Sequence, residues 1–256
     1  MWQNYKKKSL ADRQEIQRIL LETWGYDQFR PLQEDIILSV LSGKDTLALM
    51  PTGGGKSITF QVPALARAGI CLVVTPLIAL MKDQVDQLNR LKIKAMAIHS
   101  GMNPYEIDIA LNNCVYGDFK FLYLSPERLS TRLFRTRVVD MNVNLIAVDE
   151  AHCISQWGYD FRPSYLEIRS LRDILEDIPV LALTATATPE VCEDIQDSLG
   201  FGQKNLFQKS FNRENLDYLV KTTENKAAEL LGLISQMEGS GIVYTRSRKK
   251  SRELAQ

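Results

Sequence analysis

The sequence has little of what marks membrane, secreted or zinc-binding proteins. No apolar run approaches the roughly 18 residues that a membrane helix needs, and residues 1–9 are polar and basic with no apolar segment behind them, unlike a signal peptide. The four cysteines lie far apart and form no Cys-x-x-Cys pair. We therefore expect reduced thiols, no zinc, no contact with a membrane and a cytoplasmic location.

The chain also lacks an excess of charge of either sign. Its 31 basic and 31 acidic residues give a formal net charge of zero, so bulk charge offers no support for nucleic-acid binding, which must rest on local sites. No internal repeat or low-complexity tract is found. With 256 residues, 45% of them hydrophobic, the chain is long enough for one large α/β domain and a remainder.

The clearest local signal is a glycine-rich stretch, Thr52-Gly53-Gly54-Gly55-Lys56-Ser57. An apolar run over 46–50 precedes it and a helical pattern follows, which is the layout of a phosphate-binding loop. Glycine N–H groups and a helix N-terminus can surround phosphate oxygens. Lys56 can reach the outer phosphates of ATP, and the Ser57 hydroxyl can bind Mg²⁺. Met50 stands where a glycine is usual, and the alternative is a flexible turn after a strand.

A second set of possible nucleotide contacts lies upstream, over residues 25–33. This segment offers Tyr26, Arg30 and Gln33. A glutamine side chain has both a donor and an acceptor, as recognition of an adenine edge requires, and an aromatic ring can stack on the base. We expect Phe29, in contrast, to pack in the core.

Apolar strands and helical patterns then alternate along the chain. We expect strands over 46–50, 70–75, 94–98, 119–124, 144–148 and 180–183. We expect helices over 9–24, 31–41, 77–91, 104–115 and 166–175, and a short one near residue 126. This alternation predicts an α/β fold, with a mostly parallel sheet and helices on both faces. Ligands in such folds bind at the carboxyl ends of the strands.

Two adjacent acids follow the strand over 144–148, in the sequence Asp149-Glu150-Ala151-His152. Asp149 would hold a metal ion, directly or through water. Glu150 would orient or deprotonate the water that attacks the γ-phosphate of ATP, the alternative being an ordinary acidic turn. The His152 imidazole can hydrogen-bond from the nucleotide site toward the segment that follows, whereas we expect His99 to be a structural residue at a strand end.

That following segment, over 151–165, is rich in aromatic residues. It contains Trp157, Tyr159, Phe161 and Tyr165, together with Arg162. Nucleic-acid bases stack on aromatic rings for about 1–3 kcal/mol each, and arginine pairs with phosphate. We interpret Trp157, Phe161 and Arg162 as DNA-sensing residues and Tyr165 as a core residue. Stacking does not distinguish DNA from RNA.

These motifs together resemble those of superfamily-two helicases and, more specifically, the RecQ family of ATP-dependent DNA helicases. The resemblance rests on the phosphate loop, the Asp-Glu-Ala-His motif, the aromatic segment and the upstream 25–33 segment, and further matches lie at 75–84, 124–129 and 183–188. It implies a RecA-like P-loop fold, ATP and Mg²⁺ as cofactors, and single-stranded or partly duplex DNA as partner. It also implies 3′-to-5′ movement and a role in DNA repair and recombination.

The resemblance also assigns residues to roles. The implied nucleotide contacts are Tyr26, Arg30, Gln33, Thr52, Gly53, Gly54, Gly55, Lys56 and Ser57. The implied catalytic residues are Lys56, Asp149 and Glu150, with Ser57 and Asp149 at the metal. The residues implied in DNA binding and its coupling to hydrolysis are His152, Gln156, Trp157, Phe161, Arg162, Thr184 and Thr186.

The pattern changes after residue 200. We expect a first RecA-like ATP-binding domain over 1–206 and the incomplete start of a second over 207–256. Segment 210–216 resembles the entry to that second domain, although Glu214 stands where a proline is common. Strands are expected over 216–221 and 242–245, a helix over 226–237 and another from 246. One such unit buries too little apolar surface to be stable alone.

In this family the second domain supplies arginine fingers, and Arg246 and Arg248 do not lie at that motif. We therefore expect a fragment that binds Mg²⁺-ATP weakly, hydrolyses it slowly and does not unwind DNA alone. The alternative is an ATP- and nucleic-acid-binding module without motor activity. A P-loop kinase or transport ATPase is disfavoured, because neither needs the Asp-Glu-Ala-His motif beside an aromatic segment.

Overall fold

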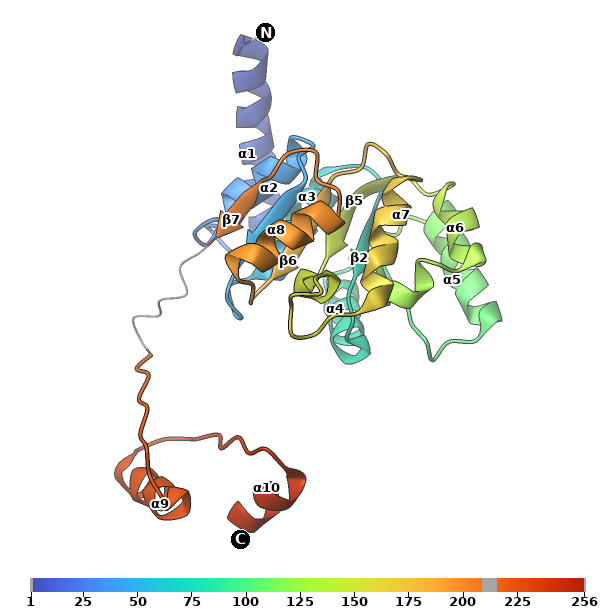
Figure 1. The fold of residues 1–256 in the computed structure, drawn as a ribbon. Coiled ribbons are helices and arrows are strands. Elements are labelled where there is room, and N and C mark those ends of the chain that lie inside the picture. The colour runs from blue at the N-terminus through green and yellow to red at the C-terminus, as the bar shows by residue number, and fades with distance from the viewer. Residues whose placement is uncertain (1, 209–215, 256) are drawn as a thin grey trace. The chain divides into compact units, whose positions relative to one another are not determined.

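The computed structural model describes residues 2–208 and 216–255, with side chains from residue 12 onward. The chain divides into two compact units, Met1–Phe211 and Asn212–Gln256, and each is described by itself (Figure 1). The first unit holds the sheet and all the candidate site residues. The predicted entry segment at 210–216 lies outside the described residues, apart from Leu216.

The first unit is built on a seven-stranded sheet in the order β3-β4-β2-β5-β6-β1-β7. Its strands are β1 Thr46–Leu49, β2 Ile70–Val74, β3 Ala95–Ile98, β4 Phe121–Leu124, β5 Val143–Val148, β6 Val180–Thr184 and β7 Leu206–Gln208. All the pairings are parallel. The predicted fold class is confirmed, and six strands lie where the sequence indicated. β7 was missed because it has only three residues and no continuous apolar run.

Helices connect the strands. They are α1 Trp2–Trp24, α2 Gln33–Leu41, α3 Lys56–Ala66, α4 Ile78–Arg90, α5 Pro104–Tyr116, α6 Arg132–Val138, α7 Glu167–Arg172 and α8 Pro189–Ser198, with 3₁₀ turns at Pro126–Arg128, Ala151–Ile154 and Pro163–Leu166. The prediction that the first helix starts at Ser9 is wrong, because the preceding residues contain no glycine or proline to stop it. The predicted helix over 166–175 is shorter as α7: it starts one residue later, after the 3₁₀ turn at Pro163–Leu166, and it ends three residues earlier, where the Ile174 N–H donates to the Leu171 carbonyl in a turn.

Two helices of the first unit, α6 and α8, were not predicted. α8 nevertheless carries a readable start signal. The Thr188 hydroxyl accepts a hydrogen bond from the Val191 N–H, and Pro189 occupies the first helical position. Threonine followed by proline could therefore have located this helix.

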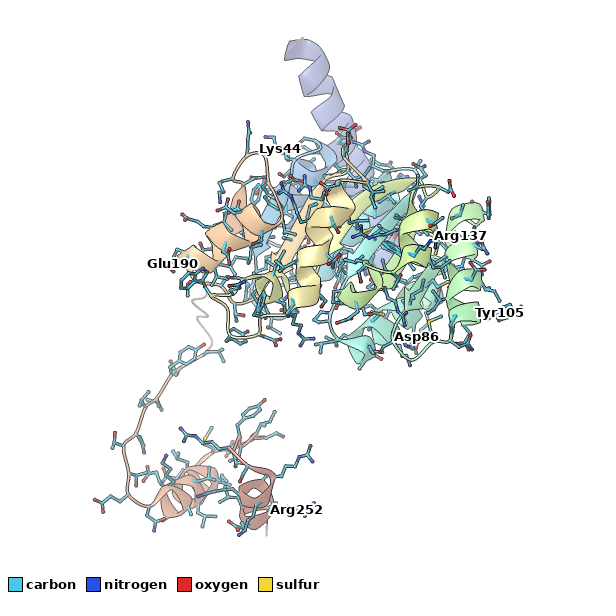
Figure 2. The ribbon with its side chains drawn as sticks, turned by 45° about the vertical axis from the view of Figure 1, so that its right-hand side comes forward. Lys44, Asp86, Tyr105, Arg137, Glu190 and Arg252 are labelled. Atoms are coloured by element: carbon cyan, nitrogen blue, oxygen red, sulfur yellow. The ribbon has the colours of Figure 1, made fainter. Side chains whose placement is uncertain are left out.

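Apolar residues alternate between the two faces of the sheet, as period-two strands require. In β1, Leu47 and Leu49 belong to one core cluster and Ala48 to the other. Helices α5 to α8 pack on the first face and α2 to α4 on the second. α1 packs outside α2 and α3 through Ile16 and Leu20, in a third cluster. The partly buried Phe29 packs against that cluster, as expected. Polar side chains of the covering helices, such as the exposed Glu190 of α8, project outward (Figure 2).

The second unit contains helices α9 Lys226–Gln236 and α10 Arg248–Leu254. The predicted helix over 226–237 is confirmed, and the predicted helix start at 246 lies two residues early. The strands predicted over 216–221 and 242–245 are wrong, since the described residues 216–255 contain no strand. A strand needs a neighbour to pair with, and here Val220 is 96% and Tyr244 90% exposed. Its identity as the start of a second RecA-like domain stays a prediction.

Candidate nucleotide and nucleic-acid site

The candidate residues meet at one edge of the sheet. Neighbouring strands β5, β6 and β1 run parallel, so their carboxyl ends lie together. The Met50 N–H donates to the Thr184 carbonyl at 3.0 Å and ties the start of the phosphate loop to the end of β6. Asp149 follows β5 at the same edge. The topology therefore gathers three segments that are distant in sequence, as expected for ligand binding in such sheets.

The phosphate loop has the backbone that its glycines permit. Gly53 and Gly55 both have φ +77°, a left-handed conformation that is costly for other residues. The Gly54 N–H donates to the Pro51 carbonyl at 2.9 Å, and α3 begins directly at Lys56. Met50, the departure from the usual pattern, is fully buried in the core. The Met50 side chain packs in the second core cluster, with Ala48 of β1 and Phe60 of α3.

Two upstream residues contact this loop. The Arg30 guanidinium donates to the Gly53 carbonyl at 2.7 Å. The Gln33 amide donates to the Gly55 carbonyl at 2.9 Å, while its oxygen accepts from the Arg30 N–H at 2.8 Å. Gln33 is only 3% exposed, whereas Tyr26 is 53% exposed. The sequence placed these residues at the nucleotide but missed that Arg30 and Gln33 hold the loop itself. Their contact with adenine stays a prediction.

The acidic pair faces the loop lysine. Lys56 Nζ lies 3.7 Å from Glu150 Oε1, and the Glu150 N–H donates to Asp149 Oδ1 at 3.0 Å. Glu150 adopts a left-handed conformation, φ +49°, which bends the chain sharply after β5. Burial raises the pKa of Asp149, the Lys56 charge opposes that rise, and the neighbouring Glu150 carboxylate adds to it. The site therefore concentrates negative charge that a cation can relieve.

His152 connects the acids to β6. Its Nδ1 lies 2.9 Å from Thr184 Oγ1 and 3.4 Å from Glu150 Oε2. The Thr184 hydroxyl donates to the Thr186 carbonyl and accepts from the Thr186 N–H. With the hydroxyl proton on the Thr186 carbonyl, the matching imidazole tautomer carries its hydrogen on Nδ1 and donates it to Thr184. Burial lowers the pKa of His152, although Glu150 opposes the shift, and burial thus favours the uncharged ring.

The aromatic segment leaves η2 Ala151–Ile154 and returns to η3 Pro163–Leu166. Trp157 is 81% exposed, and its backbone N–H donates to the Ser155 hydroxyl at 3.2 Å. Arg162 pairs with Asp160 at 3.0 Å. Tyr165 is fully buried, as expected of a core residue, and its hydroxyl donates to the Asp149 carbonyl at 2.9 Å.

The predicted DNA-side residues divide by exposure. Gln156, Trp157 and Thr186 are exposed, Phe161 and Arg162 are half-buried, and His152 and Thr184 are buried. The residue that sequence reasoning left without a role is Tyr159, which contacts both Thr186 and His152. Its position inside the aromatic segment was the available signal. The spatial partners could not be read from the sequence.

A possible metal-ligand cluster lies beside this segment. Ligand atoms of His152, Cys153 and Asp160 fall within 4.8 Å of one another. The Cys153 thiol, however, donates to the Asp160 carboxylate, which also accepts from Arg162. Burial raises the pKa of Cys153 to about 12, and the Arg162 contact lowers the pKa of Asp160. The arginine thus already supplies the positive charge that a metal ion would bring.

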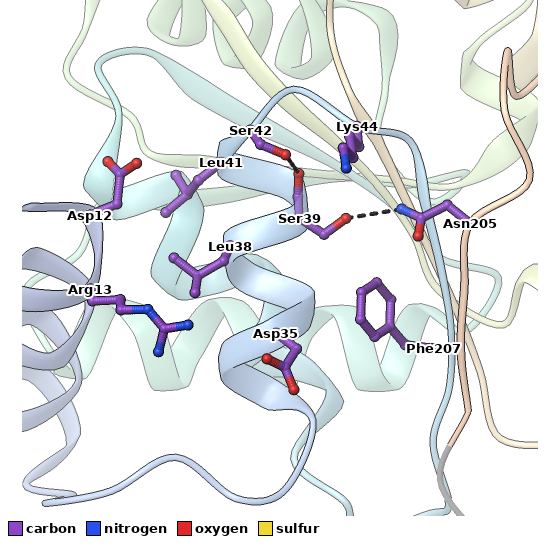
Figure 3. A pocket seen from close by; sticks show the side chains of 10 residues that line it. All are labelled: Asp12, Arg13, Asp35, Leu38, Ser39, Leu41, Ser42, Lys44, Asn205 and Phe207. Carbon is purple, nitrogen blue, oxygen red and sulfur yellow. Dashed lines mark hydrogen bonds between the residues drawn. The ribbon is translucent and has the colours of Figure 1, made fainter. Parts of the chain in front are cut away.

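A surface pocket lies beside the edge strand β7, between α1, α2 and that strand (Figure 3). Leu38, Ser39 and Phe207 are among its lining residues. The Asn205 amide there donates to the Asp45 carbonyl, immediately before β1. None of the candidate site residues lines this pocket. Among the described residues, no helix is both long and apolar enough to cross a membrane.

Comparison with known proteins agrees with this geometry. The model of the DEAD/DEAH box helicase family matches residues 30–195. The chain is 42% identical over 244 residues to a protein described as "Probable ATP-dependent DNA helicase RecS" from Bacillus subtilis, which covers 94% of this chain and 49% of that protein. It is 45% identical over 238 residues to "ATP-dependent DNA helicase RecQ" from the same organism, covering 92% of this chain and 40% of that protein.

The chain thus spans about half or less of these curated relatives. Among solved structures, the DUF1998 helicase MrfA matches with a TM-score of 0.73 and 20% identity, covering 94% of this chain and 39% of that one. At that identity the likeness speaks for the fold alone.

Proposed function

The chain belongs to the DEAD/DEAH box helicase family, and from this premise we propose that it is the nucleotide-binding motor portion of a RecQ-like, ATP-dependent DNA helicase. The observation that carries the proposal is the approach of Lys56 to Glu150 at the phosphate loop, with Asp149 adjacent. A loop that binds phosphate without these acids would serve binding alone. Their presence beside the lysine supports hydrolysis.

On the nucleotide side, the loop residues 52–57 bind the phosphates through backbone N–H groups and the Lys56 ammonium. Gln33, Arg30 and Tyr26 lie toward the base. The Ser57 hydroxyl and the Asp149 carboxylate are hard oxygen donors that suit Mg²⁺, and they would hold it. Bound Mg²⁺ neutralises charge on phosphate oxygens.

The chemical step follows from the acidic pair. Glu150 orients a water molecule and accepts its proton as the water oxygen bonds to the γ-phosphorus. The bond from that phosphorus to the bridging oxygen breaks, and ADP and inorganic phosphate result. Lys56 stabilises the charge that develops on the phosphate oxygens. The His152 hydrogen bond to Thr184 keeps the imidazole beside Glu150.

On the nucleic-acid side, Trp157, Phe161 and Arg162 contact DNA by stacking and phosphate pairing, with Gln156 beside them. Thr184 and Thr186 relay this contact toward the nucleotide. The relatives' names favour DNA over RNA as the substrate. Movement in the 3′-to-5′ direction and a role in repair and recombination are proposed on the same RecQ likeness.

The activity of residues 1–256 by themselves is expected to be low. In phosphoryl transfer an arginine finger accelerates the reaction by roughly 10³–10⁵-fold, and this chain spans only part of its relatives' length. We therefore propose weak Mg²⁺-ATP binding, slow hydrolysis and no strand separation by the isolated chain.

The proposal is tested by ATP hydrolysis with and without single-stranded DNA. Lys56→Ala is expected to reduce turnover by roughly 10²–10³-fold, because a charge that stabilises the transition state is lost. Lys44→Ala is the matched control, since Lys44 is exposed and precedes the amino end of β1, whereas Lys56 lies beyond the carboxyl end of that strand. Trp157→Ala is expected to lose the response to DNA.

Equal turnover in Lys56→Ala and the parent chain would refute the proposed site. Binding of ATP without turnover, or turnover that DNA never changes, would instead support the alternative of a nucleotide-binding module without motor activity. Robust strand separation by this chain would contradict the expectation of low activity.

A further inference from the structure

Tyr159 makes two contacts that no other residue of the aromatic segment combines. Its hydroxyl is hydrogen-bonded to Thr186 Oγ1 at 2.7 Å. Its ring stacks on the His152 imidazole, with centroids 5.2 Å apart and planes 23° from parallel. One aromatic side chain thus touches a residue after β6 and a residue of the turn after β5.

The two partners of Tyr159 are themselves connected through Thr184. His152 Nδ1 is hydrogen-bonded to Thr184 Oγ1 at 2.9 Å. The Thr184 hydroxyl exchanges two hydrogen bonds with the Thr186 backbone, at 3.2 and 3.3 Å. Tyr159 therefore completes a closed cycle of contacts with Thr186, Thr184 and His152. Within this cycle, His152 Nδ1 lies 3.4 Å from Glu150 Oε2.

This cycle of contacts runs from the surface of the protein to its interior, as the exposed fractions of the side chains show. Tyr159 is 77% exposed, whereas His152 is 5% and Thr184 0% exposed. The outer part of the tyrosine is open to a stacking base, while its hydroxyl contacts Thr186 and its inner face contacts His152, the neighbour of Glu150. Tyr159 thus reaches solvent on one side and His152, beside the catalytic acid, on the other. It is therefore placed to connect a DNA contact at the surface with the catalytic acid.

Resting on the proposed function, we propose that Tyr159 is the positioning residue that transmits a DNA contact at the aromatic segment to Glu150. When a base displaces the segment, the phenol shifts Thr186 and the ring shifts His152, which lies against the Glu150 carboxylate.

Trp157 is a weaker candidate for this transmission. It is 81% exposed, and of its groups only the backbone N–H has a hydrogen bond among the described residues, to Ser155. The indole can contact a base but has no polar link to the nucleotide side. Trp157 therefore binds DNA, and Tyr159 transmits the effect of that binding to Glu150.

The test compares Tyr159→Phe, which keeps the stack on His152 and removes the hydroxyl, with Thr186→Val and the double variant. The measured quantities are the fold-stimulation of ATP hydrolysis by single-stranded DNA, the KM for ATP and the Kd for DNA. Each single variant is expected to lower fold-stimulation by about three- to tenfold, the range of one hydrogen bond. KM for ATP and Kd for DNA are expected to stay within about twofold.

The double variant is expected to be no worse than either single variant, because both remove the same bond. Additive losses would mean instead that the two side chains act separately, whereas a merely structural role would also change KM for ATP or Kd for DNA. Tyr105→Phe is the matched control: Tyr105 projects from α5, is 75% exposed and has no side-chain hydrogen bond among the described residues (Figure 2).

The possible results are distinguishable. Full stimulation in Tyr159→Phe, or additive losses in the double variant, would overturn the role of Tyr159 and leave the proposed function standing. A parent chain whose hydrolysis is insensitive to DNA would overturn the DNA coupling in the proposed function and, with it, this inference. If Tyr105→Phe also loses stimulation, the effect is not specific to the contacts that Tyr159 makes.

Discussion

Gln33 shows how a residue expected at a ligand can also shape the loop that binds it. Its amide uses its donor on the Gly55 carbonyl and its acceptor on the Arg30 N–H. An added Cβ at Gly55 would lie 2.4 Å from the Gln33 nitrogen, so the loop glycine and the glutamine require each other. The glutamine thereby fixes the loop in the shape that surrounds phosphate.

Replacing Gln33 with glutamate should therefore damage the loop. A carboxylate has no hydrogen to donate, so one of its oxygens would face the Gly55 carbonyl oxygen. We expect the free energy of unfolding to fall by roughly 1–3 kcal/mol, the cost of a buried unsatisfied group, and ATP to bind more weakly. Urea denaturation and titration with a fluorescent ATP analogue measure both.

Gln28→Glu is the control for that experiment, since Gln28 is exposed in the same segment and the change in charge is identical. If the two variants unfold at the same urea concentration, Gln33 does not support the loop as described.

Residue identities at the site were readable from the sequence where a local motif carried them. The loop lysine and the acids Asp149 and Glu150 each follow a recognisable strand, and the sheet brings them together as expected. The contact between Tyr159 and Thr186 could not be predicted from the sequence, because the two residues lie 27 positions apart and follow different strands. The hydrogen bonds of Gln33 to the loop could not be predicted either, since a glutamine side chain can bond to a ligand or to the backbone equally well.

At the scale of elements, a close approach of backbones fixes how β2 meets β5. Gly69, just before β2, has φ +104°. An added Cβ there would lie 2.1 Å from the Asn142 carbonyl oxygen, which also accepts the Ile70 N–H at 2.8 Å. Because Val73 and Ala147 in these two strands are core residues, displacing this junction would disturb the centre of the sheet.

Gly69→Ala should therefore destabilise the first unit by about 3 kcal/mol, since the conformation and the contact are both unfavourable for alanine. Chemical denaturation followed by circular dichroism measures the loss. Gly202→Ala is the control, because a Cβ at Gly202 meets no atom within 4 Å. Equal stability of the two variants would mean that the junction adjusts without cost.

Elements were predictable where they are long and strongly patterned. Buried strands such as β2 and β5 appear as continuous apolar runs because both faces are covered. The short β7 gave no such run. The strands predicted over 216–221 and 242–245 have the right composition, but strand formation also depends on a neighbour to pair with, which composition does not supply.

At the scale of the molecule, the core belongs to the first unit. The three clusters of buried apolar residues, with the residues packed against them, lie between Ile16 and Phe207. In the second unit, Val220 is 96%, Tyr244 90% and Leu231 68% exposed. Apolar burial supplies most of the favourable free energy of folding, so local stability should differ sharply between the two units.

Hydrogen exchange of the whole chain, followed by mass spectrometry, should display this difference. Peptides over 216–225 and 238–247 are expected to exchange within seconds, because their backbone lies outside helices and strands and their side chains are largely exposed. Peptides that cover β2 and β5 should stay protected for hours, since opening them requires unfolding the sheet. Peptides of α5, whose outer face is exposed, provide an internal reference of intermediate protection. Slow exchange over 242–245 would mean that the predicted strand forms in solution after all, and that the second unit finds the partner a strand requires.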